Sequence, residues 1–182
     1  GLWTCLRQHL LDTMMISHHI WNDYLCQNVR DRIDEELDGH GETVLSFLSG
    51  VHDIGKCTPA FEKQAPSQYD GIMNNLKSNG FIIPDGIRSK DLRHETSGFV
   101  AIRDALIRHG HSMDSANSLA IVIGGHHGKY HIKTIYSSVK RKRKREYGDG
   151  VWQSERDAII DDMFSMNGME DIDGLLSDTV IS

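Results

Sequence analysis

The chain has 182 residues, of which 38% are hydrophobic and 25% are charged, and its formal net charge is −6. This length suits one ordinary domain with a hydrophobic core of its own. The net charge argues against a general nucleic-acid binder. No apolar run approaches the roughly 20 residues that span a bilayer, and no signal-peptide pattern opens the sequence, which excludes a membrane-spanning protein.

The spacing of apolar residues predicts helices over most of the chain. The predicted helices, in chain order, cover 2–29, 43–54, 69–79, 95–109, 114–124, 152–166 and 169–182. Gly55 is expected to end the second helix in the left-handed conformation. The rest of 58–89 contains all three prolines and is expected to be loop. No strand alternation appears, so the predicted fold class is all-α.

The three cysteines (Cys5, Cys26 and Cys57) lie far apart, without a C-x-x-C spacing. This pattern is typical of reduced thiols in a cytosolic protein, and we expect them to be buried or half-buried. The sequence starts at Gly1 without a methionine and stops at Ser182 in an apolar stretch. We therefore expect 1–182 to be a single domain that has been cut from a longer polypeptide.

Histidine is unusually frequent, with 11 residues, and it is the commonest metal ligand in proteins. The most informative position is the adjacent pair His52–Asp53. An imidazole and a carboxylate can bind one divalent cation together, and the second carboxylate oxygen is free to bridge to another. The two side chains lie about 100° apart around a helix axis, so both can point into one groove at the helix end.

Other histidines lie where they could join this pair as metal ligands. His94 precedes a predicted helix, and His126–His127 follow one between glycines. Side chains at the ends of separate helices can converge on one point. His9 lies inside the first predicted helix and has to face inward to join them.

Such a set, rich in imidazole and with one bridging carboxylate, suits divalent Mn, Fe, Co, Ni or Zn better than Mg or Ca. Two ions roughly 3.5–4 Å apart favour phosphoester hydrolysis, because they generate a metal-bound hydroxide at neutral pH and bind the phosphate oxygens. This chemistry needs no side-chain nucleophile. The sequence contains no recognisable Ser/His/Asp or Cys/His arrangement, which agrees with that mechanism.

Together, these motifs resemble the HD-superfamily nuclease domain of type I CRISPR systems, which is fused to or partnered with a superfamily 2 helicase. They span residues 9 to 128 in the order that is typical of this family. The motifs are His9, His52-Asp53-Ile54-Gly55-Lys56, Arg93-His94-Glu95 with Ser97, and Gly125-His126-His127-Gly128.

The resemblance implies an HD-domain helical bundle with the metal site in a groove between helix ends. It implies two divalent transition-metal ions as cofactors. It assigns His9, His52 and Asp53 to one ion and His94, His126 and His127 to the other, with Asp53 as the bridge. It further implies metal-dependent cleavage of single-stranded DNA in CRISPR antiviral interference in the prokaryotic cytoplasm. The helicase and the CRISPR surveillance complex are the implied partners, and endonuclease or exonuclease action stays open.

One departure concerns a further metal-binding aspartate, which the family carries late in the domain in an Ala-Asp-Trp-like stretch. This chain ends with Asp178-Thr179-Val180-Ile181-Ser182, without that stretch. Either Asp178 takes the role or the chain was cut just short of the ligand. In the second case we expect the first metal site to bind more weakly than the second.

The remaining candidates have two interpretations each. Lys56 either contacts a substrate phosphate or is a lysine favoured at the end of a helix. The basic run at 140–145 is either a solvated loop or a nucleic-acid-binding patch beside the groove. Tyr147 and Trp152 either stack on bases or belong to the core. The basic residues are Lys140, Arg141, Lys142, Arg143, Lys144 and Arg145.

Two other functions compete with the single-stranded DNA nuclease. One is an HD phosphohydrolase that acts on nucleotides or signalling nucleotides, which would need a closed pocket rather than an open groove with basic rims. The other is a non-catalytic HD fold that serves as a docking module, although such a module has no need for the histidine array.

Overall fold

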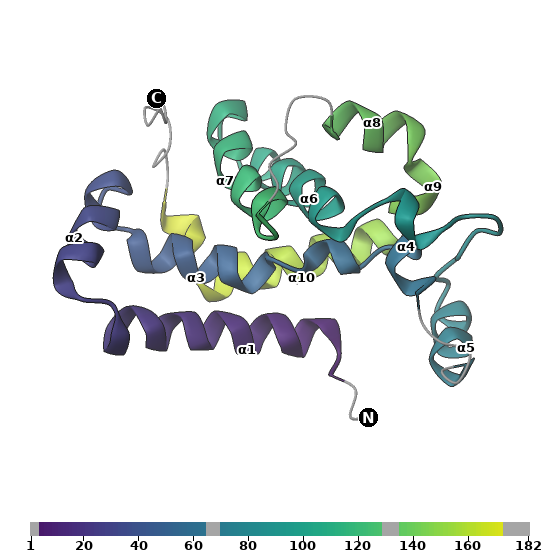
Figure 1. The fold of residues 1–182 in the computed structure, drawn as a ribbon, viewed down its shortest axis with the longest axis horizontal. Helices are drawn as coiled ribbons and strands as arrows, with labels where there is room; N and C mark the ends of the chain where they lie inside the picture. The colour runs from purple at the N-terminus through teal and green to yellow at the C-terminus, as the bar shows by residue number, and fades with distance from the viewer. Residues whose placement is uncertain (1–3, 65–69, 129–134, 173–182) are drawn as a thin grey trace.

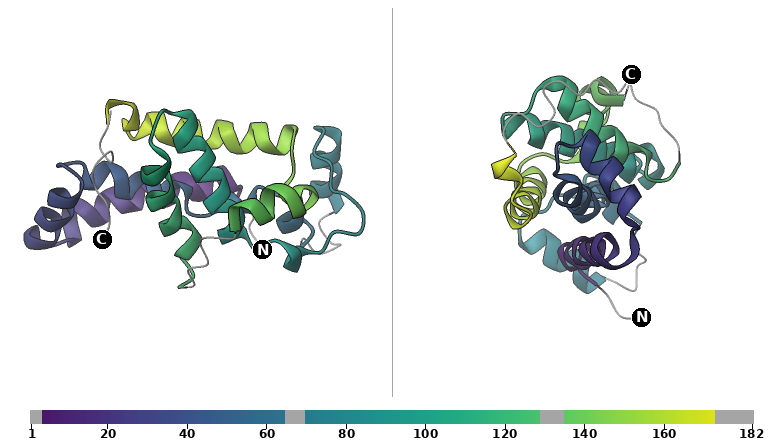
Figure 2. Two further views of the ribbon diagram at one scale, coloured as in Figure 1. Left: turned by 90° about the horizontal axis from the view of Figure 1, so that it is seen from above. Right: turned by 90° about the vertical axis from the view of Figure 1, so that its left-hand side faces the viewer.

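The computed structural model describes residues 4–64, 70–128 and 135–172. Three helices follow the long axis of the molecule: α1 (Leu6–His19), α3 (Gly41–Val51) and α10 (Val151–Met166). A second layer is the pair α6 (His94–Arg108) and α7 (Met113–Gly125), which pack along each other and cross the first three (Figures 1 and 2). The core lies between the two layers.

Shorter elements connect these five helices. They are the π-helix η1 (Ile20–Tyr24), α2 (Gln27–Glu36), the 3-10 turn η2 (Ile54–Lys56), α4 (Pro59–Glu62), α5 (Asp70–Ser78), the 3-10 turn η4 (Ser89–Asp91), α8 (Ile135–Lys142), α9 (Lys144–Tyr147) and the 3-10 turn η5 (Met169–Asp171). The described residues contain no strand, which confirms the all-α prediction. None of the helices in the described ranges is long and apolar enough to cross a membrane.

The core is built from the apolar faces that the spacing predicted. Val44, Phe47 and Val51 of α3 are fully or almost fully buried, because they recur every three or four residues and so share one face of the helix. Fully buried residues of the facing helices complete this cluster: Leu10, Val100, Ile102, Ala120 and Ile160. Burial of this kind stabilises the fold by about 1.5–3 kcal/mol for each large side chain.

The helix predicted over 2–29 is not continuous. The chain widens into a π-helical turn at Ile20–Tyr24, and Leu25 takes an extended backbone before α2 begins. The ring of Trp21 is buried against the backbone of Gly41, at the start of α3. Apolar spacing alone does not register this turn, because hydrophobic residues continue on both sides of it.

Gly55 was also predicted wrongly, since it does not cap a helix in the left-handed conformation. It lies in η2, and a Cβ atom there would stand 1.8 Å from the carbonyl oxygen of His94 and 2.5 Å from the nitrogen of Gly98. The position therefore needs glycine because the backbones of η2 and α6 touch.

Three further expectations are corrected. The basic run is helical, in α8 and α9, rather than loop, and α4 was not predicted at all. Cys5 and Cys26 are exposed and only Cys57 is buried, although none of the three forms a disulfide. Of the last predicted helix, the described residues form only η5. Asp178 lies outside the described residues.

Candidate metal centre

The contact between η2 and α6 places the predicted ligands side by side. The backbone of Gly55 meets that of His94 at the start of α6. The Ser97 hydroxyl lies 3.0 Å from the carbonyl oxygen of Gly55 and 3.1 Å from that of His94, so it ties the two segments together. As a result, the turn that carries Asp53 is held against the first residue of α6.

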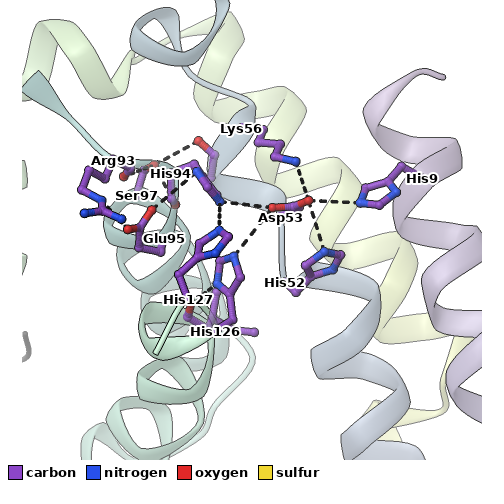
Figure 3. A network of polar contacts seen from close by, with 12 residues as sticks. His9, His52, Asp53, Lys56, Arg93, His94, Glu95, Ser97, His126 and His127 are labelled. Carbon is purple, nitrogen blue, oxygen red and sulfur yellow. Dashed lines mark hydrogen bonds and ion pairs between the residues drawn. The ribbon is translucent and has the colours of Figure 1, made fainter. Parts of the chain in front are cut away.

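Asp53 lies at the centre of this site and is 5% exposed (Figure 3). Its Oδ2 lies 3.0 Å from His9 Nε2, 3.2 Å from His52 Nε2 and 2.6 Å from Lys56 Nζ. Its Oδ1 lies 3.3 Å from His94 Nε2 and 3.8 Å from His126 Nε2. Each carboxylate oxygen therefore faces its own set of imidazoles.

The potential ligand atoms form two compact groups. We call His9, His52 and Asp53 the first triad, and His94, His126 and His127 the second triad. Within each triad the atoms that could coordinate an ion all lie within 4.8 Å of one another. The structure thus brings together all six residues for which the sequence predicted metal binding, from α1, the end of α3, the start of α6 and the end of α7 (Figure 3).

The tautomers of two histidines are fixed by the backbone. His52 donates its Nδ1 hydrogen to the carbonyl oxygen of Ser49 at 2.8 Å, and His126 donates its Nδ1 hydrogen to that of Ile123 at 2.6 Å. In the neutral ring the Nε2 lone pair then points at Asp53, as in metal sites where a second partner orients the imidazole. Nε2 of His126 is buried and has no hydrogen-bond partner among the described residues.

This arrangement sets lone pairs against a carboxylate, which accepts hydrogen bonds but donates none. A neutral imidazole nitrogen and a carboxylate oxygen attract each other only through a cation between them, which is either a metal ion or the proton of an imidazolium. In the second triad, Nε2 of His127 lies 3.0 Å from Nε2 of His94, which again directs two nitrogens at one place. The donor set therefore fits divalent cations of the imidazole-binding kind.

The pKa shifts at the site agree with a carboxylate that is surrounded by positive charge. Burial tends to raise the pKa of Asp53, but hydrogen bonds from the protonated His52 ring and from Lys56 outweigh it and hold the pKa below its usual range. The same hydrogen bond to Asp53 raises the pKa of His52. Burial lowers the pKa of His94, which favours the neutral imidazole that a metal requires.

Two residues beside the second triad had no predicted role, although they belong to a motif that the sequence displays. Glu95 is 6% exposed, and its Oε2 lies 3.5 Å from Nδ1 of His94. Arg93 forms an ion pair with the other oxygen of Glu95. Glu95 is therefore placed to orient the His94 ring, as carboxylates behind metal-binding histidines do.

Phe61 is a site residue that was not predicted from the sequence, because α4 itself was not predicted. Its ring centre lies 5.6 Å from Lys56 Nζ and 6.0 Å from the centre of the His94 ring. Phe61 is partly exposed. It offers an aromatic surface next to the two triads.

Arg156 supports the site from behind. Its guanidinium is 1% exposed and donates to the carbonyl oxygens of Cys57, Tyr147 and Gly148 at 2.8–2.9 Å. The guanidinium carbon also lies 4.0 Å from the centre of the Tyr147 ring. A cation in the core thus holds α10 to the residue that follows η2, so the turn with Lys56 cannot shift without breaking these bonds.

The basic run is mostly engaged within the protein. Lys140 pairs with Asp104 at 2.5 Å, Lys144 pairs with Asp149 at 3.5 Å, and Arg143 lies 4.0 Å from Glu146. Arg145 donates to the carbonyl oxygen of Asp85. Arg141 is exposed, and the side chain of Lys142 lies outside the described part of the chain.

The two aromatic residues next to this run are core residues. Tyr147 is 7% exposed and Trp152 is 4% exposed, so neither offers a face to a base. The indole nitrogen of Trp152 donates to the carbonyl oxygen of Ile82 at 2.8 Å, which anchors the start of α10.

The chain is similar to known CRISPR-associated proteins. The chain is 31% identical to the CRISPR-associated nuclease/helicase Cas3 of Streptococcus thermophilus, over 70% of this chain and 14% of that protein. The crystal structure of a CRISPR-associated protein superposes with a TM-score of 0.79 at 27% identity, over 92% of this chain and 18% of the other. T. fusca Cas3 with AMPPNP gives a TM-score of 0.72 at 22% identity, with the same coverage, and so supports the fold.

The chain thus spans less than a fifth of the length of these relatives. Residues 1–179 match the family described as the HD domain of Cas3. This match covers nearly the whole sequence, including both triads. The chain therefore belongs to the Cas3 HD domain family, a family of CRISPR-associated nuclease domains.

Proposed function

We propose that this chain is a metal-dependent phosphodiesterase that cleaves single-stranded DNA in CRISPR interference, with two divalent ions held by the two triads. One observation carries the proposal, namely that Oδ2 of Asp53 faces the first triad and Oδ1 faces the second. A carboxylate in this position can bridge two ions. Bound there, such a pair supplies an activated water and neutralises charge on the phosphate.

The side chains of this site have separate tasks in the proposal. The imidazoles of His9 and His52 hold one cation, and those of His94, His126 and His127 hold the other. The hydrogen bonds from Nδ1 of His52 and His126 to backbone carbonyls keep the Nε2 lone pairs directed inward. Lys56 places an ammonium group 2.6 Å from Asp53, where it suits an oxygen of the phosphodiester.

The name of one relative supports the proposed partners. The Streptococcus thermophilus relative is named a nuclease/helicase. We propose that this chain likewise works with a superfamily 2 helicase, in the same or a separate polypeptide, and with a CRISPR surveillance complex in the prokaryotic cytoplasm. The hollows on both sides of the triads are open, which suits a strand better than a nucleotide enclosed in a pocket.

The test is a direct comparison of circular single-stranded DNA with deoxynucleotides. Each is incubated with the purified chain and Mn, Ni, Co or Mg, and products are resolved on gels and by chromatography. We expect cleavage of the circle with the transition metals and little with Mg. Hydrolysis of nucleotides without cleavage of DNA would contradict the proposal and favour a phosphohydrolase.

A further inference from the structure

Two hollows lie on opposite sides of Asp53 and differ in charge. The hollow of about 650 Å³ beside His127, here the His127 hollow, is lined by His94 and Glu95 together with two cations, Lys90 and Arg93. The hollow of about 390 Å³ beside His9, here the His9 hollow, has Lys56 as its cation. Its acidic lining residues are Asp12 and Glu62.

The two hollows differ even more in the charges that remain free to contact a ligand than in the charged residues that line them. In the His9 hollow, the ammonium of Lys56 is already bound to Asp53 at 2.6 Å, and two carboxylates remain. In the His127 hollow, Glu95 is 6% exposed and is covered by its ion pair with Arg93. A polyanion therefore meets repulsion on one side of the triads and attraction on the other.

Lys90 is held in position by its own turn. It lies in η4, where Arg88 forms two hydrogen bonds with Asp91, of 3.1 and 2.8 Å. The neighbouring carboxylate is thereby neutralised. Lys90 itself is exposed and forms no ion pair with any residue in the described ranges.

Arg93 stands at the boundary between the hollow and the second triad. Its Nε is paired with Glu95, and more than half of its side chain is exposed. The planar guanidinium has five N–H donors, and it binds phosphate oxygens readily. It is the residue directly before His94, so a phosphate held by Arg93 adjoins the second triad.

We propose that Lys90 and Arg93 form a phosphate-binding subsite for the substrate strand, so that the backbone next to the cleaved phosphodiester lies in the His127 hollow. The subsite rests on the proposed function for its ligand, a single-stranded DNA. The strand is held chiefly on this side of the triads. Apart from the contact of Lys56 with the cleaved phosphodiester, the acidic His9 hollow makes no phosphate contact. The basic run of α8 and α9 is not needed for this contact.

The experiment compares a strand with a small diester that cannot reach the hollow. The substrates are a 20-nucleotide single-stranded DNA and thymidine 5′-p-nitrophenyl phosphate, each with Mn. The variants are Lys90→Gln, Lys90→Gln/Arg93→Gln and the matched control Arg32→Gln/Lys77→Gln, which removes two exposed charges from α2 and α5. Affinity for a fluorescent strand is also measured by anisotropy without metal, over a range of salt concentrations.

We expect the double variant to raise KM and Kd for the strand about tenfold, since an exposed ionic contact contributes up to about fivefold. The slope of log Kd against log salt should fall by about 0.7 for each lost contact with a single strand. Lys90→Gln alone should show about half of this effect on a logarithmic scale. In both variants, the ratio of activity on the strand to activity on the small diester should fall.

Two results would overturn the subsite. One is an equal change in the Arg32/Lys77 control, which would reflect overall charge. The other is an equal loss on both substrates, which would mean that Arg93 acts on His94 through Glu95. If the unmodified chain cleaves neither substrate with any metal, the proposed function fails, and the anisotropy measurement still decides whether Lys90 and Arg93 bind the strand.

Discussion

The two triads differ in how firmly the protein holds them. In the first, the His9 side chain is 42% exposed on α1, and Lys56 competes for Oδ2 of Asp53. In the second, His127 is exposed, but His94 and His126 are less than one-fifth exposed and lie at the adjoining ends of the packed pair α6 and α7. We expect the second triad to bind its ion more tightly, because two of its three ligands are ordered before the ion arrives and no ammonium occupies the site.

Substitution of Asp53, which lies between the triads, should give the largest loss of activity. Asp53→Asn keeps the shape of the side chain and removes the charge that both ions share. We expect the kcat for single-stranded DNA to fall by at least about 1,000-fold, equivalent to about 4 kcal/mol of lost transition-state stabilisation. Cleavage by the variant is measured beside an Asp31→Asn control on α2. Survival of activity in Asp53→Asn would contradict a two-ion mechanism.

Removal of one imidazole from each triad tests whether the second triad binds its ion more tightly than the first. In a calorimetric titration with Mn²⁺ we expect two classes of site in the unmodified chain. His126→Ala should weaken the tighter class by at least about 100-fold, and His9→Ala should weaken the other class. If His9→Ala removed the tighter ion, the order of the two triads would be reversed.

Glu95→Gln tests the support behind His94. The substitution keeps an oxygen near Nδ1 but removes the charge that orients the ring. We expect the affinity of the second triad to fall about tenfold, as for other residues behind metal ligands. Competition with a fluorescent chelator measures it, and the affinity of the first triad serves as the internal reference. Equal weakening of both ions would show that the fold, rather than His94, had been disturbed.

Lys56→Met should strengthen ion binding at the first triad, whereas the histidine substitutions weaken it. The ammonium lies 2.6 Å from Oδ2 of Asp53, so its removal frees that oxygen for the ion. We expect the affinity of the first triad to rise about fivefold, equivalent to about 1 kcal/mol, while the kcat for DNA falls. The same titration and cleavage assays measure both changes. A lower affinity in Lys56→Met would mean that the ammonium supports the site instead of competing for it.

Much of the fold was predictable because helix formation leaves a local pattern. The helices around α6, α7 and α10 begin and end within one residue of their predicted limits, since their apolar residues recur every three or four positions. Helices α8 and α9 were missed because charges dominate their sequence. The turn after Tyr24 was missed because apolar residues continue through it.

The candidate ligands were likewise visible as residue types at helix ends, and the structure gathers all six. Their division was implied only by the family resemblance. It depends on which carboxylate oxygen of Asp53 faces which helix, and this is decided by the packing of η2 on α6. Glu95 directly follows His94 in the sequence, but its contact with the ring depends on the rotamer that it adopts when buried.

The sequence by itself determined an all-helical chain with a histidine and aspartate set suited to divalent metals, because periodicity and side-chain chemistry are local properties. The tertiary structure decided that Gly55 is a point of backbone contact rather than a helix cap. It also decided that Asp53 faces histidines of both triads and that Lys90 and Arg93 share one hollow with His127. These features join segments tens of residues apart, and only packing in three dimensions fixes which side chains meet.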